Sequence, residues 1–416
     1  MNTVQTTNTH PVRVWKLNLK RTLRILAMII IGVIVIALVI AVLIYPPIYV
    51  YRTIAWRESD AFDWQKFPAH QLKAVPTAYH SDVALEPRVE QLFEQLSGAD
   101  DWNSFLEAHD TQAFIVIQDD TILYENYFNN TRRDSIVTSF SVAKSFTSAL
   151  IGIAIEEGYI QSVDDSITTY LPELAERDPR FNEITIRHLL LMASGLEYEE
   201  FRPLLLNSDD ILTSHYPDQR KISLENTHII NPPGQYFRYN KYHPQLLGMI
   251  LERTTGMSVT DFLQTRIWDE LGMEFNGSWS TDSQASDFEK METGVNARAI
   301  DFAKFGVLFL NEGNWQGNQV ISKAWVEEST GSLLPDNYAD YYPEWFTSLP
   351  GQAYYKYMWW GIVSEEGSYD FAAEGDKGQF IYVSPQKNLV IVRNGLDYGI
   401  PTEEWIKLFY EFARRL

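Results

Sequence analysis

A run of 20 apolar residues, from Ile25 to Ile44, is the sequence feature that most constrains how this chain can fold. The run contains no charged and no amide side chain. A helix of this length covers about 30 Å, which matches the hydrocarbon core of a bilayer. Only a helix lets a single segment satisfy all of its backbone hydrogen bonds there. The sequence therefore predicts one N-terminal transmembrane helix, which we place at residues 25–45.

The residues around this run predict its orientation. Residues 1–24 carry five basic side chains and no acidic one. Basic residues that flank a transmembrane helix usually remain in the cytoplasm. We therefore expect residues 1–24 to form a cytoplasmic tail and the chain after the helix to be periplasmic or extracellular. Aromatic residues between 45 and 56 are typical of a membrane interface, and Pro46 and Pro47 are expected to end the helix. The alternative is a cleaved signal peptide, but its apolar core normally has about 7–15 residues, so we expect an uncleaved single-pass anchor.

Composition excludes several kinds of site. The chain of 416 residues has no cysteine, which rules out disulfides, thiolate metal sites and a cysteine nucleophile. Beyond residue 24 it carries 29 basic and 55 acidic side chains. Nucleic-acid binding needs clustered Lys and Arg, so we expect no nucleic-acid partner. None of the eight His residues shares a metal-ligand spacing with acidic residues, and we expect no metal and no cofactor.

The rest of the chain divides into a linker and one globular domain. Residues 46–90 contain five Pro and no clear periodicity, which is typical of a stalk, and residues 91–416 form the predicted domain. Hairpin patterns occur near both of its ends, at 113–128 and 379–393, and a last helix begins at Thr402. Helical patterns occupy the middle, at 141–157, 184–191, 246–254 and 299–310. This order predicts an α+β, layered α/β/α architecture: an antiparallel sheet built from both ends and flanked by helices, with a helical insertion.

Two S-x-x-K motifs are the strongest chemical signal in the sequence, although roughly one chance match is expected in a chain of this size. Ser384 and Lys387 lie in the predicted turn of the second hairpin, where the lysine would point to solvent. Ser141 and Lys144 instead open a helix that is apolar on nearly every side and is therefore buried. Because positions i and i+3 share a helix face, we expect the Ser141 hydroxyl and the Lys144 amine to lie together.

This arrangement suits nucleophilic catalysis. A serine hydroxyl is a poor nucleophile unless a base takes its proton. Burial lowers the pKa of a lysine because desolvation disfavours the ammonium form, so Lys144 can be that base. The helix N-terminus favours negative charge, and the backbone amide of Ser141 can face a developing oxyanion. The alternative is a core helix that buries an unpaired lysine without a function, which is rare.

The sequence around these residues resembles a known family. The segment TSFSVAKSFT at 138–147 resembles the active-site segment of the serine β-lactamase and penicillin-recognising superfamily, with the class C β-lactamases and their esterase and peptidase relatives closest. Further landmarks follow in that family's order: LPEL at 171–174, ITIRHLLLMASG at 184–195, PGQYFRYNK at 233–241, AIDFAKFG at 299–306 and GDKGQ at 375–379. Within the superfamily the chain looks most like the 6-aminohexanoate-dimer hydrolases. The resemblance covers residues 90–416 and implies a β-lactamase/transpeptidase-like fold.

The resemblance also implies roles for particular residues. Ser141 matches the acylated nucleophile, and Lys144 matches its proton-accepting partner. Tyr239 matches the tyrosine of a Y-x-N motif, which passes the proton to the leaving group. Gly378 matches the glycine of the third motif, usually K-T-G or H-x-G, and the backbone amide of Gln379 is then the expected second oxyanion donor.

Two positions depart from the family's pattern. Lys241 stands where many relatives have Asn, and Asp376 stands where relatives carry a cation. An acidic group at that place would repel the carboxylate of a β-lactam or of a D-Ala-D-Ala peptide. The alternative is a shift of the motif by one residue, in which case Lys377 supplies the cation.

Other candidate residues have weaker support. Tyr198 and the two glutamates after it follow the S-G pair and are candidate pocket residues, but the pattern favours a solvated loop. The pair Trp359–Trp360 could stack on a substrate, although packing on a sheet is the favoured interpretation. His188 lies on an apolar stretch, which is typical of a core histidine.

We therefore expect a membrane-anchored serine hydrolase that cleaves an ester or amide bond through a Ser141 acyl-enzyme. Its substrate would be a small ester, a linear amide or a peptide outside the cytoplasm. One alternative is a D-alanyl-D-alanine carboxypeptidase or a true β-lactamase, which the altered third motif disfavours. Others are a non-catalytic, penicillin-binding-like module and a penicillin-sensing receptor. The intact set of Ser141, Lys144 and Tyr239 argues against the module, and the short cytoplasmic tail argues against the receptor.

Overall fold

The computed structural model describes residues 11–200, 206–331, 348–364 and 366–416. The chain forms two compact units, residues 1–57 and 58–416. In the first unit, α1 (Pro11–Ile44) contains the apolar run and ends just before Pro46, and α2 (Pro47–Ala55) follows. The segment Arg21–Ile44 has a mean hydropathy of 3.5 and is long enough to cross a membrane, a test that a signal sequence near an N-terminus also passes. The predicted helix is present, and it extends upstream into the basic tail.

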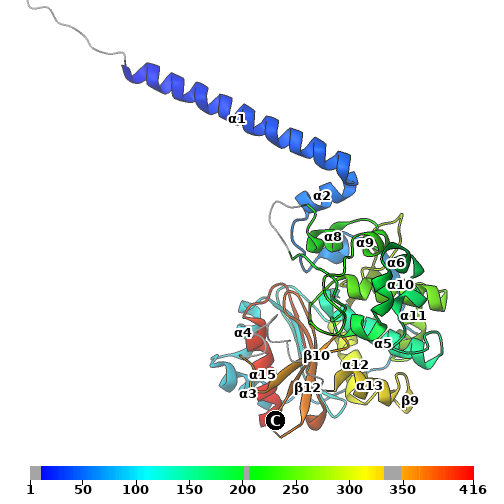
Figure 1. The fold of residues 1–416 in the computed structure, drawn as a ribbon. Coiled ribbons are helices and arrows are strands. Elements are labelled where there is room, and N and C mark those ends of the chain that lie inside the picture. The colour runs from blue at the N-terminus through cyan, green and yellow to red at the C-terminus, as the bar shows by residue number, and fades with distance from the viewer. Residues whose placement is uncertain (1–10, 201–205, 332–347, 365) are drawn as a thin grey trace, which may run out of the picture. The chain divides into compact units, whose positions relative to one another are not determined.

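The second unit is organised around a large, mainly antiparallel sheet (Figure 1). Its described strands, in spatial order, are β10 (Gln352–Lys356), β11 (Trp359–Val363), β12 (Tyr369–Gly375), β13 (Gln379–Ser384), β14 (Leu389–Gly395), β3 (Thr111–Gln118), β4 (Thr121–Tyr127) and β2 (Asp82–Val83). Strands β14 and β3 are neighbours, with Val392 opposite Ile115. The C-terminal hairpin therefore pairs directly with the N-terminal one, as the order of the patterns predicts.

Strands that precede residue 90 also pair within this unit. β2 runs parallel to β4, with Asp82 opposite Thr121. A smaller sheet has the order β1 (Ala69–Leu72), β6 (Gly277–Ser280), β7 (Val295–Ala297) and β5 (Val137–Thr138), and β8 (Asn314–Trp315) pairs with β9 (Asn318–Gln319). Part of the segment that we interpreted as a stalk is therefore built into two sheets of this unit.

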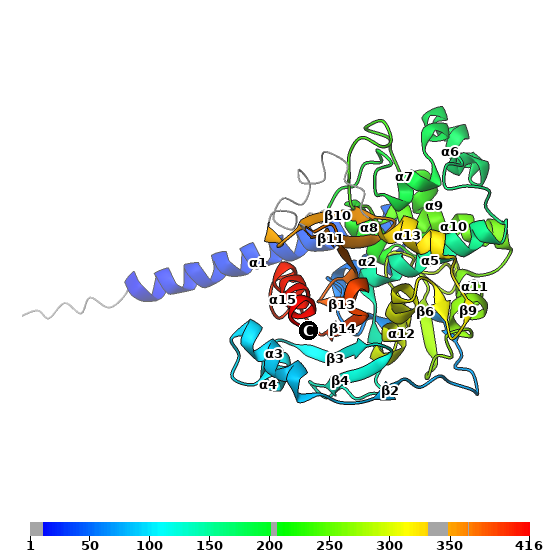
Figure 2. The same ribbon diagram turned by 90° about the horizontal axis from the view of Figure 1, so that it is seen from below.

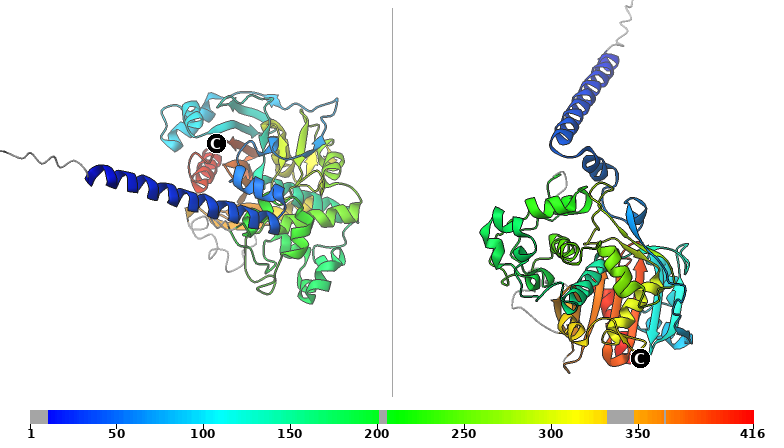
Figure 3. Two further views of the ribbon diagram at one scale, coloured as in Figure 1. Left: turned by 90° about the horizontal axis from the view of Figure 1, so that it is seen from above. Right: turned by 90° about the vertical axis from the view of Figure 1, so that its right-hand side faces the viewer.

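Helices cover both faces of the large sheet, as Figure 2 and Figure 3 show from further sides. One face packs against α3 (Pro87–Ser97), α4 (Trp102–Ala108) and α15 (Thr402–Arg415). On the other face, α12 (Ala299–Leu310) lies directly on β13, β14 and β3, and α5 (Ala143–Glu156) packs behind it. The remaining described helices belong to the region between the hairpins: α6 (Pro172–Arg177), α7 (Ile186–Leu190), α8 (Asp209–His215), α9 (Gln219–Glu225), α10 (Tyr242–Thr255), α11 (Val259–Leu263) and α13 (Lys323–Thr330).

The two central helices are apolar around their circumference because both of their sides are buried. Every residue from 143 to 154 in α5 is buried, and so is every residue of α12. Phe146 of α5 stacks on Phe305 of α12, with ring centroids 3.8 Å apart. Gly306 allows α12 to approach the sheet, since a Cβ there would lie 2.7 Å from side-chain atoms of Ile381 and Val390. The predicted α+β fold is confirmed, while strands β10 to β12 lie outside the hairpins that the sequence predicts.

Candidate active site

Ser141 lies at a strained turn between β5 and α5. The turn is anchored to β7, because Ser139 N donates a hydrogen bond to Val295 O at 2.8 Å. Residues 140–142 form one 3-10 turn, and Phe140 has a φ of +42°, which is unfavourable for a bulky side chain. Strain of this kind costs about 1–3 kcal/mol and is typical of functional sites. The turn leaves Ser141 partly exposed, two residues before the start of the helix.

Lys144 is fully buried and contacts Ser141. Its Nζ lies 2.7 Å from Ser141 Oγ and donates to the carbonyl oxygen of Glu292 at 2.8 Å. Burial lowers the pKa of Lys144 to about 7, and the neighbouring Lys241 cation acts in the same direction, against the smaller effect of nearby carboxylates. Near neutral pH a large fraction of this amine is therefore uncharged and can accept a proton.

Tyr239 joins this group from the turn before α10. The centroid of its ring lies 4.9 Å from Lys144 Nζ. The ring also stacks with Trp360 of β11, with centroids 6.0 Å apart. The structure thus brings together Ser141, Lys144 and Tyr239, which come from two segments about 100 residues apart in the sequence.

A loop at 192–195 supports the segment that carries Tyr239. Met192 O accepts a hydrogen bond from Arg238 N at 2.7 Å. Gly195 packs against the same segment, since a Cβ there would lie 2.0 Å from Asn231 O. The S-G pair at the end of the ITIRHLLLMASG landmark therefore marks a close contact between the backbone at Gly195 and the backbone at Asn231.

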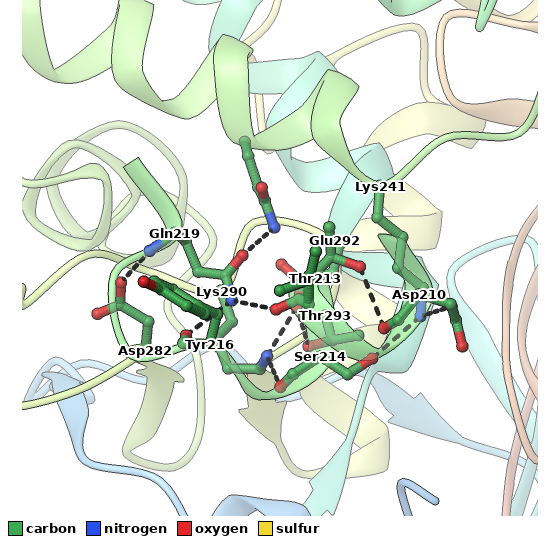
Figure 4. A network of polar contacts seen from close by, with 12 residues as sticks. Asp210, Thr213, Ser214, Tyr216, Gln219, Lys241, Asp282, Lys290, Glu292 and Thr293 are labelled. Atoms are coloured by element: carbon green, nitrogen blue, oxygen red, sulfur yellow. Dashed lines mark hydrogen bonds and ion pairs between the residues drawn. The ribbon is translucent and has the colours of Figure 1, made fainter. Parts of the chain in front are cut away.

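Lys241 forms an ion pair with Asp210, as Figure 4 shows. Its Nζ lies 2.6 Å from Asp210 Oδ1 and 3.3 Å from Ser214 Oγ. Burial alone would lower the pKa of Lys241, but Asp210, together with Glu292 and Asp376, outweighs it and the pKa is raised, so this amine stays charged near neutral pH. Tyr198 is buried and donates to the same oxygen of Asp210 at 3.2 Å. Tyr198 therefore supports the ion pair and does not lie in a solvated loop.

A second ion pair connects this one to Lys144. Lys290 Nζ lies 2.8 Å from Glu292 Oε1 and donates to the carbonyl oxygen of Ser214 at 3.0 Å (Figure 4). Ser214 thus contacts Lys241 through its side chain and Lys290 through its backbone. Because the Glu292 carbonyl accepts a hydrogen bond from Lys144, both ion pairs and the Lys144 amine belong to one polar network.

The sheet approaches Ser141 at Gly375, the last residue of β12. A Cβ at Gly375 would lie 2.4 Å from Ser139 O and 3.1 Å from Ser141 N, so only glycine fits here. Gly378 lies instead against Arg393, whose Nη1 donates to the Gly378 carbonyl oxygen at 2.7 Å. The close approach to the serine therefore occurs three residues before the glycine that the motif alignment implies.

The side chain of Gln379 points toward β14. It donates to Gly395 O at 2.8 Å, and its Oε1 accepts a hydrogen bond from Asn394 at 3.0 Å. In the part of the chain that the structure describes, no side-chain hydrogen bond of Gln379 reaches Ser141. The oxyanion role of the Gln379 amide stays a prediction, and the amide that directly follows Gly375 is that of Asp376.

Asp376 and Lys377 have different partners. Asp376 Oδ1 accepts hydrogen bonds from the Lys377 amide at 3.0 Å and from the Tyr398 hydroxyl. The ammonium group of Lys377 pairs with Asp397 at 3.4 Å and lies 5.6 Å from the centroid of the Tyr398 ring. The cation of Lys377 is therefore engaged away from Ser141, and the altered motif presents a carboxylate.

The remaining sequence candidates have structural roles. Trp359 is buried in the core. Burial lowers the pKa of His188, and its Nδ1 accepts a hydrogen bond from the Thr185 amide at 3.1 Å. Ser384 of the second S-x-x-K motif donates to a buried Asp370 at 2.7 Å. Among the described residues, no group of three His, Asp or Glu side chains could hold a metal ion.

Sequence reasoning missed four residues of this site: Asp210, Lys290, Glu292 and Gly375. Gly375 opens the G-D-K-G-Q segment, so its close approach to another backbone could have been predicted. The other three lie in no motif. They reach the site only because α8 and the loop before β7 fold toward Lys144 and Lys241.

Comparison with known proteins agrees with this geometry. The model of the family described as Beta-lactamase matches residues 103–394. The chain is 25% identical to the 6-aminohexanoate-dimer hydrolase of Paenarthrobacter ureafaciens, over 82% of this chain and 86% of that one. It is also 25% identical to Penicillin-binding protein 4 of Amycolatopsis lactamdurans, over 68% of this chain and 77% of that one.

Solved structures share the fold. A Bacillus anthracis protein assigned as a 6-aminohexanoate-dimer hydrolase has a TM-score of 0.70 and 24% identity, covering 89% of this chain and 93% of that one. A class C β-lactamase has a TM-score of 0.58 and 16% identity, covering 80% of this chain and 97% of that one. With a family match over most of its length, the chain belongs to the β-lactamase family and is a serine hydrolase that acts on amide or ester bonds.

Proposed function

We propose that this protein is a membrane-anchored hydrolase that cleaves small esters, linear amides or peptides through an acyl-enzyme on Ser141. The contact of 2.7 Å between Lys144 Nζ and Ser141 Oγ carries the proposal. This contact supports catalysis because burial lowers the pKa of Lys144 to about 7, so the amine can take the serine proton near neutral pH.

The proposed reaction has two halves. In the first, Lys144 accepts the proton of Ser141 while Oγ bonds to the substrate carbonyl carbon. In this proposal the amides of Ser141 and of Asp376 hold the oxyanion, which the close approach of Gly375 to the Ser141 amide supports. Tyr239 then passes a proton from Lys144 to the leaving alcohol or amine as its bond to the carbonyl breaks. In the second half, water attacks the carbonyl carbon of the acyl ester and gives a proton to Lys144. Lys144 passes this proton to Ser141 Oγ as the acyl–Oγ bond breaks, which releases the acid and the free serine. No cofactor takes part.

The substrate class follows from the relatives and from Asp376. One relative is named for hydrolysis of the 6-aminohexanoate dimer, and another is named as a penicillin-binding protein. The carboxylate of Asp376 counts against a β-lactam or a D-Ala-D-Ala peptide, because both carry a carboxylate one carbon away from the leaving nitrogen. In the 6-aminohexanoate dimer the carboxylate lies at the far end of the chain, five carbons away from that nitrogen. A D-alanyl-D-alanine carboxypeptidase or β-lactamase activity is therefore the second candidate.

Hydrolysis by the full-length chain in detergent tests this proposal. We expect turnover of a short-chain 4-nitrophenyl ester and slower or no turnover of a chromogenic cephalosporin and of a D-Ala-D-Ala peptide. Fast opening of the cephalosporin, or release of D-alanine, would replace the proposal with the second candidate. A folded chain that turns over none of these substrates and no linear amide would favour a non-catalytic binding module.

The proposed location rests on α1 and the basic residues before its apolar run. We propose that residues 25–45 span the membrane, that the N-terminus is cytoplasmic and that the catalytic domain is periplasmic or extracellular. Alkaline phosphatase fused after residue 60 should be active, since it requires export. An inactive phosphatase at this position, together with a fluorescent cytoplasmic reporter, would contradict the orientation. A protein that lacks residues 1–44 after purification from membranes would instead show a cleaved signal peptide.

A further inference from the structure

Apart from Lys144, the lysines of this site are already paired with carboxylates. The pairs are Lys241 with Asp210 at 2.6 Å, Lys290 with Glu292 at 2.8 Å and Lys377 with Asp397 at 3.4 Å. Lys144 forms no ion pair with a carboxylate of the described residues, and near neutral pH a large fraction of it is uncharged, because burial lowers its pKa to about 7. Among these three described ion pairs, a substrate carboxylate would therefore find no lysine that lacks a carboxylate partner.

Asp376, by contrast, is a carboxylate that has no cationic partner among the described residues. Its two hydrogen-bond donors, the Lys377 amide and the Tyr398 hydroxyl, are neutral, and both reach Oδ1. Within the described ranges, Asp376 forms no ion pair and its Oδ2 accepts no hydrogen bond. The residue is partly exposed, so a ligand can reach this oxygen.

The position of Asp376 places this charge beside the reacting centre. It directly follows Gly375, whose backbone lies against the amide of Ser141. Consecutive Cα atoms are about 3.8 Å apart, so the backbone of Asp376 lies close to the turn that carries the serine. Its charge also acts on both Lys144 and Lys241.

We propose that the substrate carries a positive charge, as an ammonium or alkylammonium group, and that Asp376 is the carboxylate that binds it. This rests on the proposed acyl-enzyme function and names the substrate class of the same site. The Tyr398 hydroxyl orients the carboxylate by donating to Oδ1, which leaves Oδ2 for the substrate cation. Charge pairing of this kind favours a cationic substrate over a neutral one of the same shape, and it repels an anionic one.

Two isosteric pairs of substrates test this with the full-length chain in detergent. The first pair places the charge on the acyl side: 4-nitrophenyl esters of 4-(trimethylammonio)butanoate and of 5,5-dimethylhexanoate. The second places it on the leaving group: acetylthiocholine and S-(3,3-dimethylbutyl) thioacetate. Each pair exchanges only a quaternary nitrogen for a carbon. We expect kcat/KM for the cation to exceed that for the neutral partner by about tenfold or more in at least one pair.

The variants separate charge from shape. Asp376→Asn keeps the acceptor for Tyr398 and removes the charge, so the ratio of the two rates should fall to about one. Tyr398→Phe removes the hydroxyl that orients the carboxylate but keeps the charge of Asp376, so the preference should weaken and stay above one. Asp120→Asn, which makes the same change on an exposed turn between β3 and β4, should leave the ratio unchanged. In the unaltered chain, the ratio should also fall as salt is added, a measurement that does not depend on how any variant folds.

The outcomes are distinct for the two proposals. A ratio of one or below in both pairs, or a preference that survives Asp376→Asn or high salt, would overturn the cation-binding role. Turnover of the neutral esters would in that case still support the acyl-enzyme. A folded chain that hydrolyses neither the neutral nor the cationic esters would instead count against the proposed function itself.

Discussion

Lys144 Nζ lies 2.7 Å from Ser141 Oγ and 2.8 Å from the carbonyl oxygen of Glu292. The carbonyl fixes the amine from one side, and the hydroxyl faces it from the other. Lys144 lies in the first turn of α5, which is buried from residue 143 to 154, and Ser141 lies two residues before that helix, so the core sets this geometry. It gives the site a defined dependence on pH.

The activity should rise with pH through an apparent pKa of about 7, the value to which burial lowers Lys144. Below that pH the amine is an ammonium ion and has no lone pair for the serine proton. Above it the free amine predominates, and kcat/KM reaches a plateau. A pH–rate profile with a neutral ester between about pH 5 and 9 measures this. A flat profile, or one that falls through pH 7, would contradict the role of Lys144.

Lys241 should help to hold the pKa of Lys144 at that value. Replacing it as Lys241→Met removes a cation that disfavours the ammonium form, and it leaves Asp210, which favours that form, without its partner. The rising limb of the profile should therefore move to higher pH. In the double variant Lys241→Met, Asp210→Asn both charges are gone, so the limb should return toward its original position. An unmoved limb in the single variant would show that Lys241 acts only on structure.

Ser141, Lys144 and Tyr239 could be found from the sequence because each lies in a local motif with the spacing that its chemistry needs. The two terminal hairpins could also be predicted, since the alternation of side chains and the turn residues lie within each hairpin. Their pairing in one sheet could be inferred from the order of elements, with strands near both ends and helices between them. Asp210 and Glu292 could not be found in this way. They lie on segments that are far apart in the sequence and meet only in the folded chain, where Asp210 neutralises the half-buried Lys241 and Glu292 the buried Lys290.

Tyr239→Phe should lower kcat for an alkyl ester or a linear amide, whose leaving groups need a proton, by about 10²–10⁴-fold, which is typical for the loss of one proton-transfer group. The ring still stacks on Trp360, so the fold should be kept. Labelling by a fluorophosphonate should persist, because its fluoride leaving group needs no proton. Turnover and labelling rates measured side by side give the comparison. Equal losses in both would indicate damage to Ser141, and unchanged kcat would exclude Tyr239 from the reaction.

Gly375→Ala should lower both the labelling rate and kcat by at least about tenfold, because a Cβ would press on Ser139 O and on the Ser141 amide. Gly158→Ala is the control. It also strains the backbone, with a φ of +79°, but it places the methyl group in open space at the end of α5. This control should cost stability of about 1 kcal/mol and keep the activity. Normal labelling of the Gly375 variant would show that the sheet edge is not part of the oxyanion site.

The third motif shows where sequence comparison reaches its limit. Aligning Gly378 with the family's glycine was reasonable from local sequence, yet Gly378 packs on Arg393 and Gly375 packs on the serine turn. The difference arises from the hairpin that joins β12 to β13. Its turn occupies residues 376–378, so the strand that touches the serine has already ended at Gly375. The register of a hairpin is set by pairing in three dimensions, which a single sequence does not contain.

Labelling of the full-length chain with a fluorophosphonate probe tests the central claim most directly, because the two S-x-x-K serines provide a matched pair. We predict that the unaltered chain is labelled on one site, that Ser141→Ala abolishes labelling and ester turnover, and that Ser384→Ala retains both. Ser384 loses only its hydrogen bond to the carboxylate of Asp370, worth about 1.5–3 kcal/mol of stability. Labelling that persists in the folded Ser141→Ala variant, or that is lost in Ser384→Ala, would contradict the account.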